Sequence, residues 1–330
     1  MKSQHYIGPA VFNELAHTWD KLIETSMTNT PFQRLAYQQS WWNNLGYGTL
    51  HTITTSDDKK NLTGIAPIYQ VGQTLFLNGH IEESDYLDLI CSADNAPEVW
   101  AAVFDCLCND ASLNWDCIDL CNIPADSPTH DILPRLAQSR GFSFNTEVNE
   151  VCPIITLPGT FEDYLANLDK KQRHEVRRKI RRANEAGLEI RVIGPDDDLE
   201  TAVNQFLDLL QKSTSEKAEW LNPGRTALFH EIATSSQAAK TLQLMFAIID
   251  GQMAAALFNF IDNGRVWVYN SGFDPDAFSH LSAGVVLTAK AIEMAIENDR
   301  STFDFLRGNE TYKYRFGAAD TTIHRITIGR

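Results

Sequence analysis

The chain has 330 residues, of which 43% are hydrophobic and 22% charged, the composition of an ordinary globular protein long enough for two domains. Its formal net charge of −15 argues against a general nucleic-acid binder, because an acidic surface repels phosphate. The acidity is uneven: residues 1–150 hold 7 basic and 19 acidic residues, and the remainder holds 21 and 24. An anionic ligand is therefore easier to place in the second half.

The opening residues MKSQHYIGPAVFNEL lack the apolar run of a signal peptide, and no stretch approaches 18 consecutive apolar residues. These features predict a cytoplasmic protein without a membrane span. Six cysteines lie in the first half, and four of them fall between residues 106 and 121. Because this spacing lacks the paired CxxC pattern of zinc sites, we expect small buried side chains rather than a metal site.

The first half alternates helical and extended patterns. Strands are expected at 5–9, 50–55, 64–72, 73–79, 86–92, 117–123, 142–148 and 152–157, and helices at 12–25, 32–45, 96–110 and 128–140. The helix at 96–110 carries Val99, Val103, Phe104 and Leu107 on one face. Strands in quick succession followed by a single helix and another strand predict a mixed sheet.

The second half shows the same order with clearer signals. Helices are expected at 161–186, 199–217, 223–235 and 283–298, and strands at 188–193, 242–250, 253–261, 265–273, 301–308 and 321–329. Thr160 and Asn222 are helix caps by type and position, and Asp250-Gly251 predicts a hairpin turn. The repeated order predicts an α/β protein, with α+β mixed sheets, built from two domains of one plan at 1–150 and 151–330.

The helix expected from residue 283 offers a candidate anion site. Ser282 is a good N-cap, which leaves the amides of Ala283, Gly284 and Val285 pointing outward. A helix start of this kind attracts phosphate, and two small residues let an anion approach the backbone. Every capped helix shares this geometry, so the alternative is an ordinary helix start.

A second candidate is FDFLRGNETYKYRFG at 303–317, a strand end followed by a turn rich in polar residues. Arg307 and Lys313 can hold an anionic group. Asp304 or Glu310 can accept a proton from an amine, and Tyr312, or alternatively Tyr314, can return one to a leaving thiolate. The alternative interpretation is a solvated turn with internal ion pairs.

A basic run occupies residues 170–182, where eight of the chain's 28 Lys and Arg residues fall. On a helix, Arg173, Arg177 and Arg181 form one stripe, with Arg178 beside it. The run suits a docking surface for tRNA, an anionic lipid or a phosphorylated substrate. It equally suits the solvated face of an amphipathic helix.

The segments YNSGFDP, IEMAIEN and FDFLRGNETYKYRFG resemble the CelD/Fem-like acetyltransferases of the GNAT (GCN5-related N-acetyltransferase) superfamily. PFQRLAYQQSWWNNLG and DKKQRHEVRRKIRR are similar to that family's aromatic-rich and basic helices. The resemblance touches most of the chain and is most specific in 266–317. It implies a tandem pair of GNAT-like folds, with the acyl-donor groove in the second domain and an N-terminal domain without cofactor.

In that family's fold the acyl thioester lies between two splayed strands, here 265–273 and 301–308, and its pyrophosphate lies on the helix that begins at Ser282. The resemblance implies that Ser282, Ala283, Gly284 and Val285 bind the donor and that Tyr269 contacts substrate. The acyl group passes to an amine by direct attack, and the chain accordingly lacks a G-x-S-x-G nucleophile motif. No permanently bound cofactor is expected.

These features give three hypotheses. The first is an acyltransferase that moves an acyl group, expected to be acetyl, from coenzyme A to an amine on a small-molecule or glycan-type acceptor related to polysaccharide or the cell envelope. Only Gly284 matches the superfamily's pyrophosphate loop, so the second is a Fem-type transferase that uses aminoacyl-tRNA, held through Arg173, Arg177, Arg178 and Arg181. The third is a non-catalytic binding protein on the same scaffold.

Overall fold

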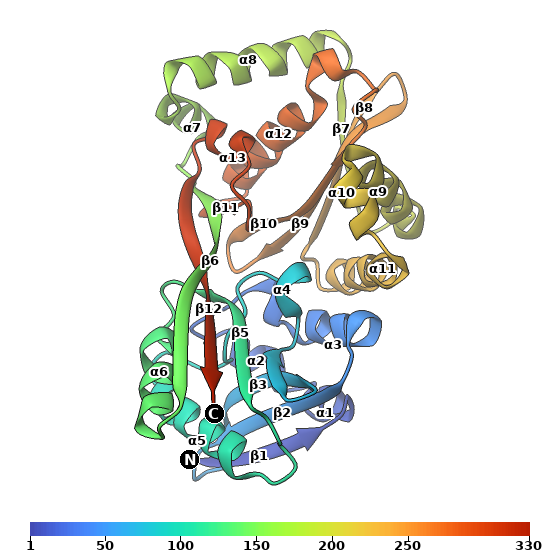
Figure 1. Cartoon of the computed structure of the whole chain (residues 1–330). Helices are drawn as coiled ribbons and strands as arrows, with labels where there is room; N and C mark the ends of the chain where they lie inside the picture. Colours follow the sequence, from blue (N-terminus) through green and yellow to red (C-terminus); the bar gives the residue numbers. More distant parts are fainter. The chain divides into compact units, whose positions relative to one another are not determined.

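The computed structural model describes residues 1–330, except for the side chain of Ser279. The chain divides into two compact units (Figure 1). The first unit consists of Met1–Val151 and Thr321–Arg330, and the second of Cys152–Asp320. Among the described helices, none combines the length and the apolar character needed to cross a bilayer.

The first unit is built on a mixed sheet in the order β1-β2-β3-β4-β5-β12-β6. Its strands are β1 (Lys2–Ile7), β2 (Thr49–Ser56), β3 (Leu62–Val71), β4 (Thr74–Leu77), β5 (Cys117–Pro124), β6 (Ser143–Thr156) and β12 (Ala319–Gly329). Its helices are α1 (Ala10–Glu14), α2 (Trp19–Ile23), α3 (Leu35–Leu45), α4 (His80–Glu83), α5 (Ala96–Asn109) and α6 (Thr129–Ser139), with a 3-10 turn at Pro31–Gln33.

The core of the first unit follows the predicted apolar faces. Val99, Val103, Phe104 and Leu107 of α5 are all buried, as the spacing predicts. A fully buried carboxylate, Asp88, accepts hydrogen bonds from the hydroxyls of Thr28, Ser127 and Thr129. These hydroxyls belong to segments far apart in the sequence, so Asp88 ties them together, although its burial raises the pKa of the carboxyl.

In the second unit the neighbouring strands follow the order β6-β11-β10-β9-β8-β7, with parallel and antiparallel pairs. Its strands are β7 (Glu189–Val192), β8 (Leu242–Ile249), β9 (Gln252–Asp262), β10 (Arg265–Phe273) and β11 (Thr302–Asp304), together with the end of β6. Its helices are α7 (Phe161–Asn167), α8 (Lys170–Glu185), α9 (Leu199–Ser213), α10 (Ser215–Trp220), α11 (Pro223–Ala238), α12 (Ala283–Glu297) and α13 (Thr311–Arg315), with a 3-10 turn at Ser279–Leu281.

Local signals in the second half set several boundaries as predicted. The hydroxyl of Thr160 accepts the Asp163 N–H, and the side chain of Asn222 accepts the Arg225 N–H, so both caps are confirmed. Asp250 and Gly251 both have positive φ, which matches the twist of the hairpin that they close.

Two expected elements are interrupted. The helix expected at 161–186 is split, because the Asp169 side chain accepts two backbone N–H groups and starts a new helix, α8. The strand expected at 301–308 ends at Asp304, and Leu306 lies in the left-handed region with φ of 57°. The sequence pattern typical of a strand continues to residue 308, whereas β11 ends at Asp304, where its pairing ends.

Helices cover both faces of the second sheet. On one face α12 packs against β8, β9 and β10, and a cluster of buried apolar side chains joins it to α7 and α8 (Figure 1). On the other face α9 packs against β9 and β10, where the rings of Phe206, Phe229 and Phe258 lie 5.4–5.5 Å apart.

The two units repeat one plan, which confirms the predicted α/β class with mixed sheets. In each unit an antiparallel meander ends in a strand, β4 or β10, and a helix of 14 or 15 residues, α5 or α12, comes before the next strand. The next strand, β5 or β11, then pairs parallel with the last strand of the meander over three residues.

The last strand departs from the expected division at residue 150. Ile323–Gly329 of β12 pair with Cys117–Pro124 of β5, so residues 321–330 belong to the first unit and not to a domain spanning 151–330. Pairing between residues about 200 positions apart satisfies the edge of β5, and no local pattern in the sequence reports it.

Gly272 of β10 provides a test of how tightly α9 is seated. A Cβ atom at this position would lie 2.5 Å from the Leu210 nitrogen, so Gly272→Ala must displace the helix backbone. We expect a loss of about 1–3 kcal/mol in the free energy of unfolding, measured by urea denaturation. Gly159→Ala, where a Cβ meets nothing within 4 Å, is the control; an equal effect of both variants would contradict this account.

Candidate functional site

The candidate site forms where β10 parts from β11. The two strands pair only from Arg265 to Trp267 on β10, although β10 continues to Phe273. A bulge at Tyr269 separates the Val268–Asn259 pair from the Asn270–Phe258 pair. The extra residue shifts the alternation of side chains along the rest of the strand.

The shift decides which side chains face α12. Before the bulge Val268 faces that helix, and after it Ser271 and Phe273 do so. Tyr269 turns instead toward Phe229 of α11, and Asn270 contacts Lys217 of α10. The ring of Tyr269 packs against Phe229 at 5.5 Å, on the opposite face of the sheet from the cavity described next. Tyr269 was expected to contact substrate, and this position does not support that role.

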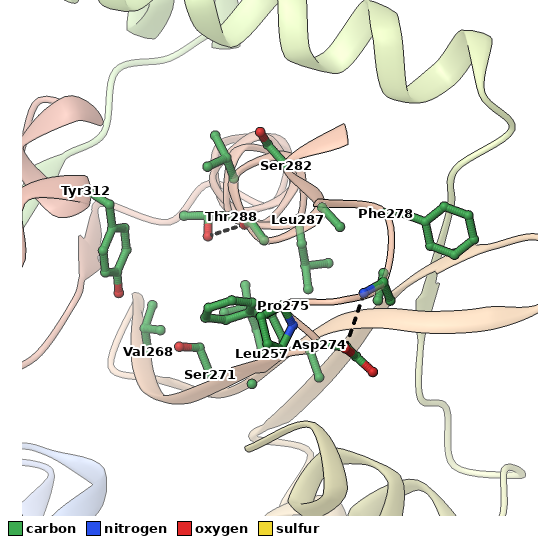
Figure 2. A pocket seen from close by; sticks show the side chains of 18 of the residues that line it. Leu257, Val268, Ser271, Asp274, Pro275, Phe278, Ser282, Leu287, Thr288 and Tyr312 are labelled. Carbon is green, nitrogen blue, oxygen red and sulfur yellow. Dashed lines mark hydrogen bonds between the residues drawn. The ribbon is translucent and has the colours of Figure 1, made fainter. Parts of the chain in front are cut away.

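A cavity of about 380 Å³ lies between the end of β10 and the start of α12 (Figure 2). Its lining is Ala254, Ala256, Leu257, Val268, Ser271, Gly272, Phe273, Asp274, Pro275, Ala277, Phe278, Ser282, Ala283, Gly284, Val285, Leu287, Thr288, Phe305 and Tyr312. Most of these side chains are apolar, and Asp274 alone among them carries a formal charge at neutral pH. Such a chamber suits a ligand with an extended, largely uncharged body.

The start of α12 forms one wall of the cavity and includes Ser282, Ala283, Gly284 and Val285. Ser282 occupies the N-cap position, but its φ of 54° places it in the left-handed region, and its side chain makes no capping hydrogen bond. The Val285 N–H donates to the Ser282 carbonyl at 3.0 Å. The expected side-chain cap and the free amide of Val285 are therefore both wrong.

Two amides of this helix start stay available to a ligand. Among the described hydrogen bonds, none uses the N–H of Ala283 or Gly284. A Cβ on Gly284 would meet nothing within 4 Å, so the space beside its Cα is open. The geometry suits a phosphate oxygen or another anionic or carbonyl oxygen.

Tyr312 lines the opposite end of the cavity, where its ring meets that of Phe305 edge to face at 5.9 Å. Burial raises the pKa of the Tyr312 hydroxyl, and the nearby Glu310 carboxylate raises it further. The hydroxyl is therefore protonated at neutral pH and can donate a hydrogen bond or a proton into the cavity.

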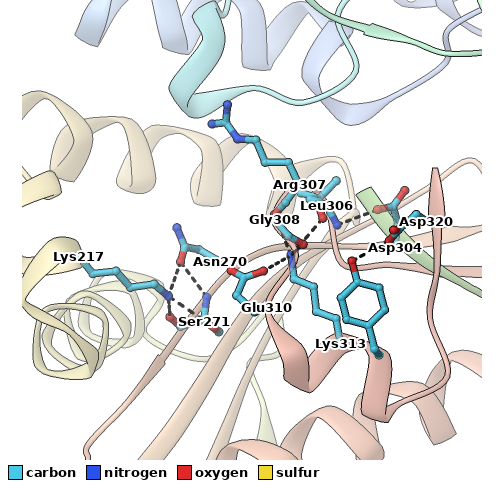
Figure 3. Close-up of polar contacts among 11 residues, drawn as sticks. Lys217, Asn270, Ser271, Asp304, Leu306, Arg307, Gly308, Glu310, Lys313 and Asp320 are labelled. Atoms are coloured by element: carbon cyan, nitrogen blue, oxygen red, sulfur yellow. Dashed lines mark hydrogen bonds and ion pairs between the residues drawn. The ribbon is translucent and has the colours of Figure 1, made fainter. Parts of the chain in front are cut away.

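Lys313 was expected to bind an anionic ligand, but its ammonium is used inside the protein (Figure 3). Its Nζ donates to the carbonyls of Leu306, Arg307 and Gly308 at 3.2, 2.7 and 3.0 Å. It also lies 2.8 Å from Oε2 of Glu310, and its side chain is 3% exposed. An ammonium has three protons, so none is left for a ligand, and the expectation is corrected: Lys313 holds the turn.

Asp304 is likewise turned inward. The residue is 1% exposed, and its Oδ1 accepts the Leu306 N–H at 2.7 Å. Because its neighbour Phe305 lines the cavity, the alternation of the strand points Asp304 to the other face. Its carboxylate organises the turn after β11 and is not placed to reach a ligand in the cavity.

Glu310 and Arg307 are the charged side chains of this turn that face outward. The side chain of Glu310 is 57% exposed, and Arg307 is partly exposed. Figure 3 shows the Arg307 guanidinium extended away from the Lys313 ammonium. The roles expected for them, a proton acceptor and a contact for an anionic group, stay predictions.

Lys217 is a residue of this region that the sequence analysis missed. Its Nζ lies 3.0 Å from Oδ1 of Asn270 and donates to the carbonyl of Ser271, one of the cavity residues (Figure 3). Burial lowers the pKa of Lys217 to about 8. A lone lysine in TSEKAEW carries no sequence signal, because only the fold brings α10 to the end of β10.

The basic run forms the exposed face of α8, which packs through the buried Val176 and Ala183. Several of its guanidinium groups have local partners. Arg173 donates to the Ala166 carbonyl, Arg177 pairs with Glu162, Arg178 with Glu175 and Arg181 with Glu185. Three of the four side chains expected to contact tRNA thus form exposed ion pairs, which contribute little to stability, and the fourth, Arg173, contacts a backbone carbonyl.

The first unit has a smaller cavity, about 240 Å³, at the equivalent parting of β4 and β5. Asp119 and Arg325 line it and form a two-point ion pair at 2.7 and 2.6 Å. In the described part of the chain, no group of three or more His, Cys, Asp or Glu side chains is arranged to hold a metal ion.

Replacing Lys313 tests its role in the turn. Lys313→Met removes the ammonium and leaves buried carbonyl oxygens without donors, so we expect a loss of about 3 kcal/mol in the free energy of unfolding. Urea denaturation measures it. Lys59→Met, at an exposed lysine of the first unit, is the control. A Lys313→Met variant as stable as the control would show that the ammonium is not needed.

Comparison with known proteins supports this description. Residues 170–314 match the family model "Acetyltransferase (GNAT) domain". This segment contains all the residues that line the cavity beside α12. No curated protein matches the sequence.

Similar solved structures include FemX, with a TM-score of 0.69 and 12% identity over 99% of this chain and 97% of that one. L-PGS from Bacillus licheniformis gives 0.59 and 12% over 95% and 91%. A tandem GNAT protein from the clavulanic acid biosynthesis pathway gives 0.51 and 11% over 98% of both chains. At such low identity these likenesses concern the fold, and they show that the chain has a tandem GNAT-like fold whose second unit carries the matched acetyltransferase segment.

Proposed function

We propose that the second unit is an N-acyltransferase that takes an acyl thioester into the cavity beside α12 and transfers its acyl group to an amine. The observation that carries the proposal is the cavity itself: it lies where two parallel strands part, and a helix start with two available amides forms its wall. The match of residues 170–314 to the GNAT acetyltransferase domain supports the same chemistry.

Coenzyme A, carrying an acetyl or a longer acyl group, is the donor that we favour. The apolar walls fit the uncharged arm of such a thioester, and the amides of Ala283 and Gly284 fit a phosphate oxygen. Asp274 is the one formally charged residue among the described lining, so the helix start supplies the attraction for the anion. The thioester contributes the activated acyl group, and the protein binds and orients it.

The transfer needs one proton acceptor and one proton donor. The amine nitrogen attacks the thioester carbonyl carbon; a carbon–nitrogen bond forms, the carbon–sulfur bond breaks, and the sulfur takes a proton. Glu310, which is exposed, accepts the proton of the amine. Tyr312 donates to the departing sulfur from inside the cavity, and its raised pKa keeps it protonated until then. Asp304 and Lys313 hold the turn that carries both residues.

The acceptor that we propose is a polar amine, on a small molecule or a glycan-type compound of the kind found in polysaccharide and the cell envelope. The net charge of −15 favours the approach of a cationic ammonium group. Arg307 sits at the same turn and can bind an anionic group elsewhere on that acceptor. Electrostatic attraction can therefore act on both the ammonium group and the anionic group of the acceptor.

A second candidate is transfer from aminoacyl-tRNA. The exposed basic face of α8 favours it, because Arg177, Arg178 and Arg181 can exchange their carboxylate partners for phosphates, and Arg173 lies on the same helix. The cavity would then hold the terminal adenosine and the aminoacyl group. A protein that binds neither donor productively would be a binding protein on a GNAT scaffold.

The donor is tested by a thermal-shift titration with acetyl-coenzyme A, free coenzyme A and longer acyl thioesters. Binding to the folded state raises Tm by an amount set by ligand concentration over Kd. We expect a saturable rise in Tm. Gly284→Glu should abolish this rise, because the new carboxylate occupies the open space at the helix start. Gly159→Glu, at an open position outside the cavity, is the control.

The aminoacyl-tRNA-dependent transferase and the binding protein predict different results in this titration and in measurements of tRNA binding and acylation. If no thioester raises Tm and tRNA binds with a steep salt dependence that charge reversal at Arg177 and Arg178 removes, the donor is aminoacyl-tRNA. If a thioester binds but no amine acceptor is ever acylated, the protein is a binding protein.

Kinetics test the assigned proton transfers. Tyr312→Phe removes the hydroxyl and Glu310→Gln the carboxylate, and each is expected to lower kcat by about 10²–10⁴-fold while the KM for the donor changes little. Initial rates with acetyl-coenzyme A and an amine acceptor measure both constants. Tyr314→Phe is the control, since its hydroxyl contacts Asp320 outside the cavity. Unchanged kcat in both variants would remove these role assignments.

A further inference from the structure

Lys217 links a short helix to the open edge of the sheet. It lies on α10, a helix of six residues without a buried side chain, and its ammonium reaches β10 (Figure 3). There it donates to the Ser271 carbonyl and lies 3.0 Å from Oδ1 of Asn270. A partly buried lysine on a surface helix is costly unless its ammonium is hydrogen bonded, so these contacts fix where it sits.

The contacted carbonyl belongs to the stretch of β10 that has lost its neighbour. After Trp267 the strand has no partner on the β11 side, and both polar backbone groups of Ser271 are satisfied from side chains. Oδ1 of Asn270 accepts the Ser271 N–H at 2.9 Å, and Lys217 donates to the Ser271 carbonyl. Lys217 and Asn270 thus take the place of the missing strand.

This stretch is also a wall of the cavity. Ser271, Gly272 and Phe273 all line it. Gly272 is held from the α9 side, where the backbone of Leu209 and Leu210 leaves no room for a Cβ. Lys217 holds the neighbouring residue, Ser271, at the edge of β10 that has no partner strand. The position of this wall therefore depends on the contact of Gly272 with α9 and on the Lys217 ammonium.

We propose that Lys217 is a positioning residue of the acyl-donor cavity: by holding the Ser271 carbonyl it fixes the end of β10 in the form that the donor requires. The inference rests on the proposed function of the cavity. Lys217 need not touch the donor, since it acts through Ser271 and the wall that Ser271 begins.

The surroundings of Lys217 lower the pKa of its ammonium, and burial is the main cause. Burial lowers its pKa to about 8; Glu310 opposes the change and Lys313 adds to it. The contacted part of β10 contributes only neutral groups, Asn270 and Ser271, among the described contacts. The charged residues of α9 near this end, Asp208 and Lys212, pair with each other at 2.8 Å, and Glu216 and Glu219 of α10 itself are exposed.

The sign of this shift separates a positioning role from a stabilising one. An ammonium whose pKa is lower in the folded state than in the unfolded state lowers stability below pH 8, and the penalty disappears as pH rises from about 8 toward 10.5. Lys217→Met removes the penalty but also leaves the Ser271 carbonyl without its donor, so the two effects on stability oppose each other. We therefore expect this variant to unfold at a Tm close to that of wild type at pH 7, yet to bind the donor less well.

Two measurements on the ligand-free and ligand-bound protein test the proposal. The first is amide hydrogen exchange of residues 270–273 without ligand, which we expect to be at least tenfold faster in Lys217→Met than in wild type. The second is the Kd for acetyl-coenzyme A by calorimetry between pH 6.5 and 9.5. We expect Lys217→Met to weaken binding about tenfold and to lose the change in Kd that wild type shows near pH 8, and Lys217→Arg, which keeps the charge, to restore much of the binding.

Lys59→Met, an exposed lysine of the first unit, is the matched control. Unchanged exchange at 270–273 in Lys217→Met overturns the inference whether or not a donor binds. Faster exchange with an unchanged Kd and pH profile also overturns it, because the wall would then move without consequence. If wild type binds no thioester while exchange responds as expected, the proposed donor fails and the positioning of β10 by Lys217 stands.

Discussion

The second unit depends on the end of pairing between β10 and β11 after Trp267. Beyond this point β10 is paired with β9 alone, so the backbone groups on its other edge need partners from elsewhere and a gap opens in the sheet. The bulge at Tyr269 sits at this point and re-aims the side chains beyond it, so that Ser271 and Phe273 face α12. The cavity, its apolar lining and the exclusion of Tyr269 from it all follow from this one irregularity.

The polar residues near the gap serve mainly to hold backbone in unusual conformations. Leu306 and Ser282 have φ of 57° and 54°, in a region that costs a non-glycine residue about 1–2 kcal/mol. Lys313 and Asp304 bind the backbone around Leu306, and Lys217 binds that of Ser271. Strained backbone gathered around a cavity is typical of a ligand site. The residues left for chemistry are those with exposed or cavity-facing ends, Glu310 and Tyr312.

The two units use one topology with different chemistry at the parting of the parallel strands. In the second unit the cavity walls are largely apolar and include a helix start with available amides. In the first unit the smaller cavity contains the Asp119–Arg325 ion pair, and Arg325 comes from the C-terminal strand. Because that strand pairs with β5, the last ten residues belong to the first unit. The shared plan therefore does not make the two cavities equivalent, and the proposed acyl transfer belongs to the second.

The sequence by itself determined the local features: the caps at Thr160 and Asn222, the turn at Asp250-Gly251, the helix from residue 283 and the polar turn after β11. Each depends on residues a few positions apart, whose backbone preferences act within one turn. Only the tertiary structure decided which face of the sheet Tyr269 lies on and that the Lys313 ammonium donates to three backbone carbonyls. It also decided that Lys217 reaches Ser271 and that residues 321–330 belong to the first unit. These outcomes depend on strand register and on contacts between distant segments, and a single sequence carries no local signal for either.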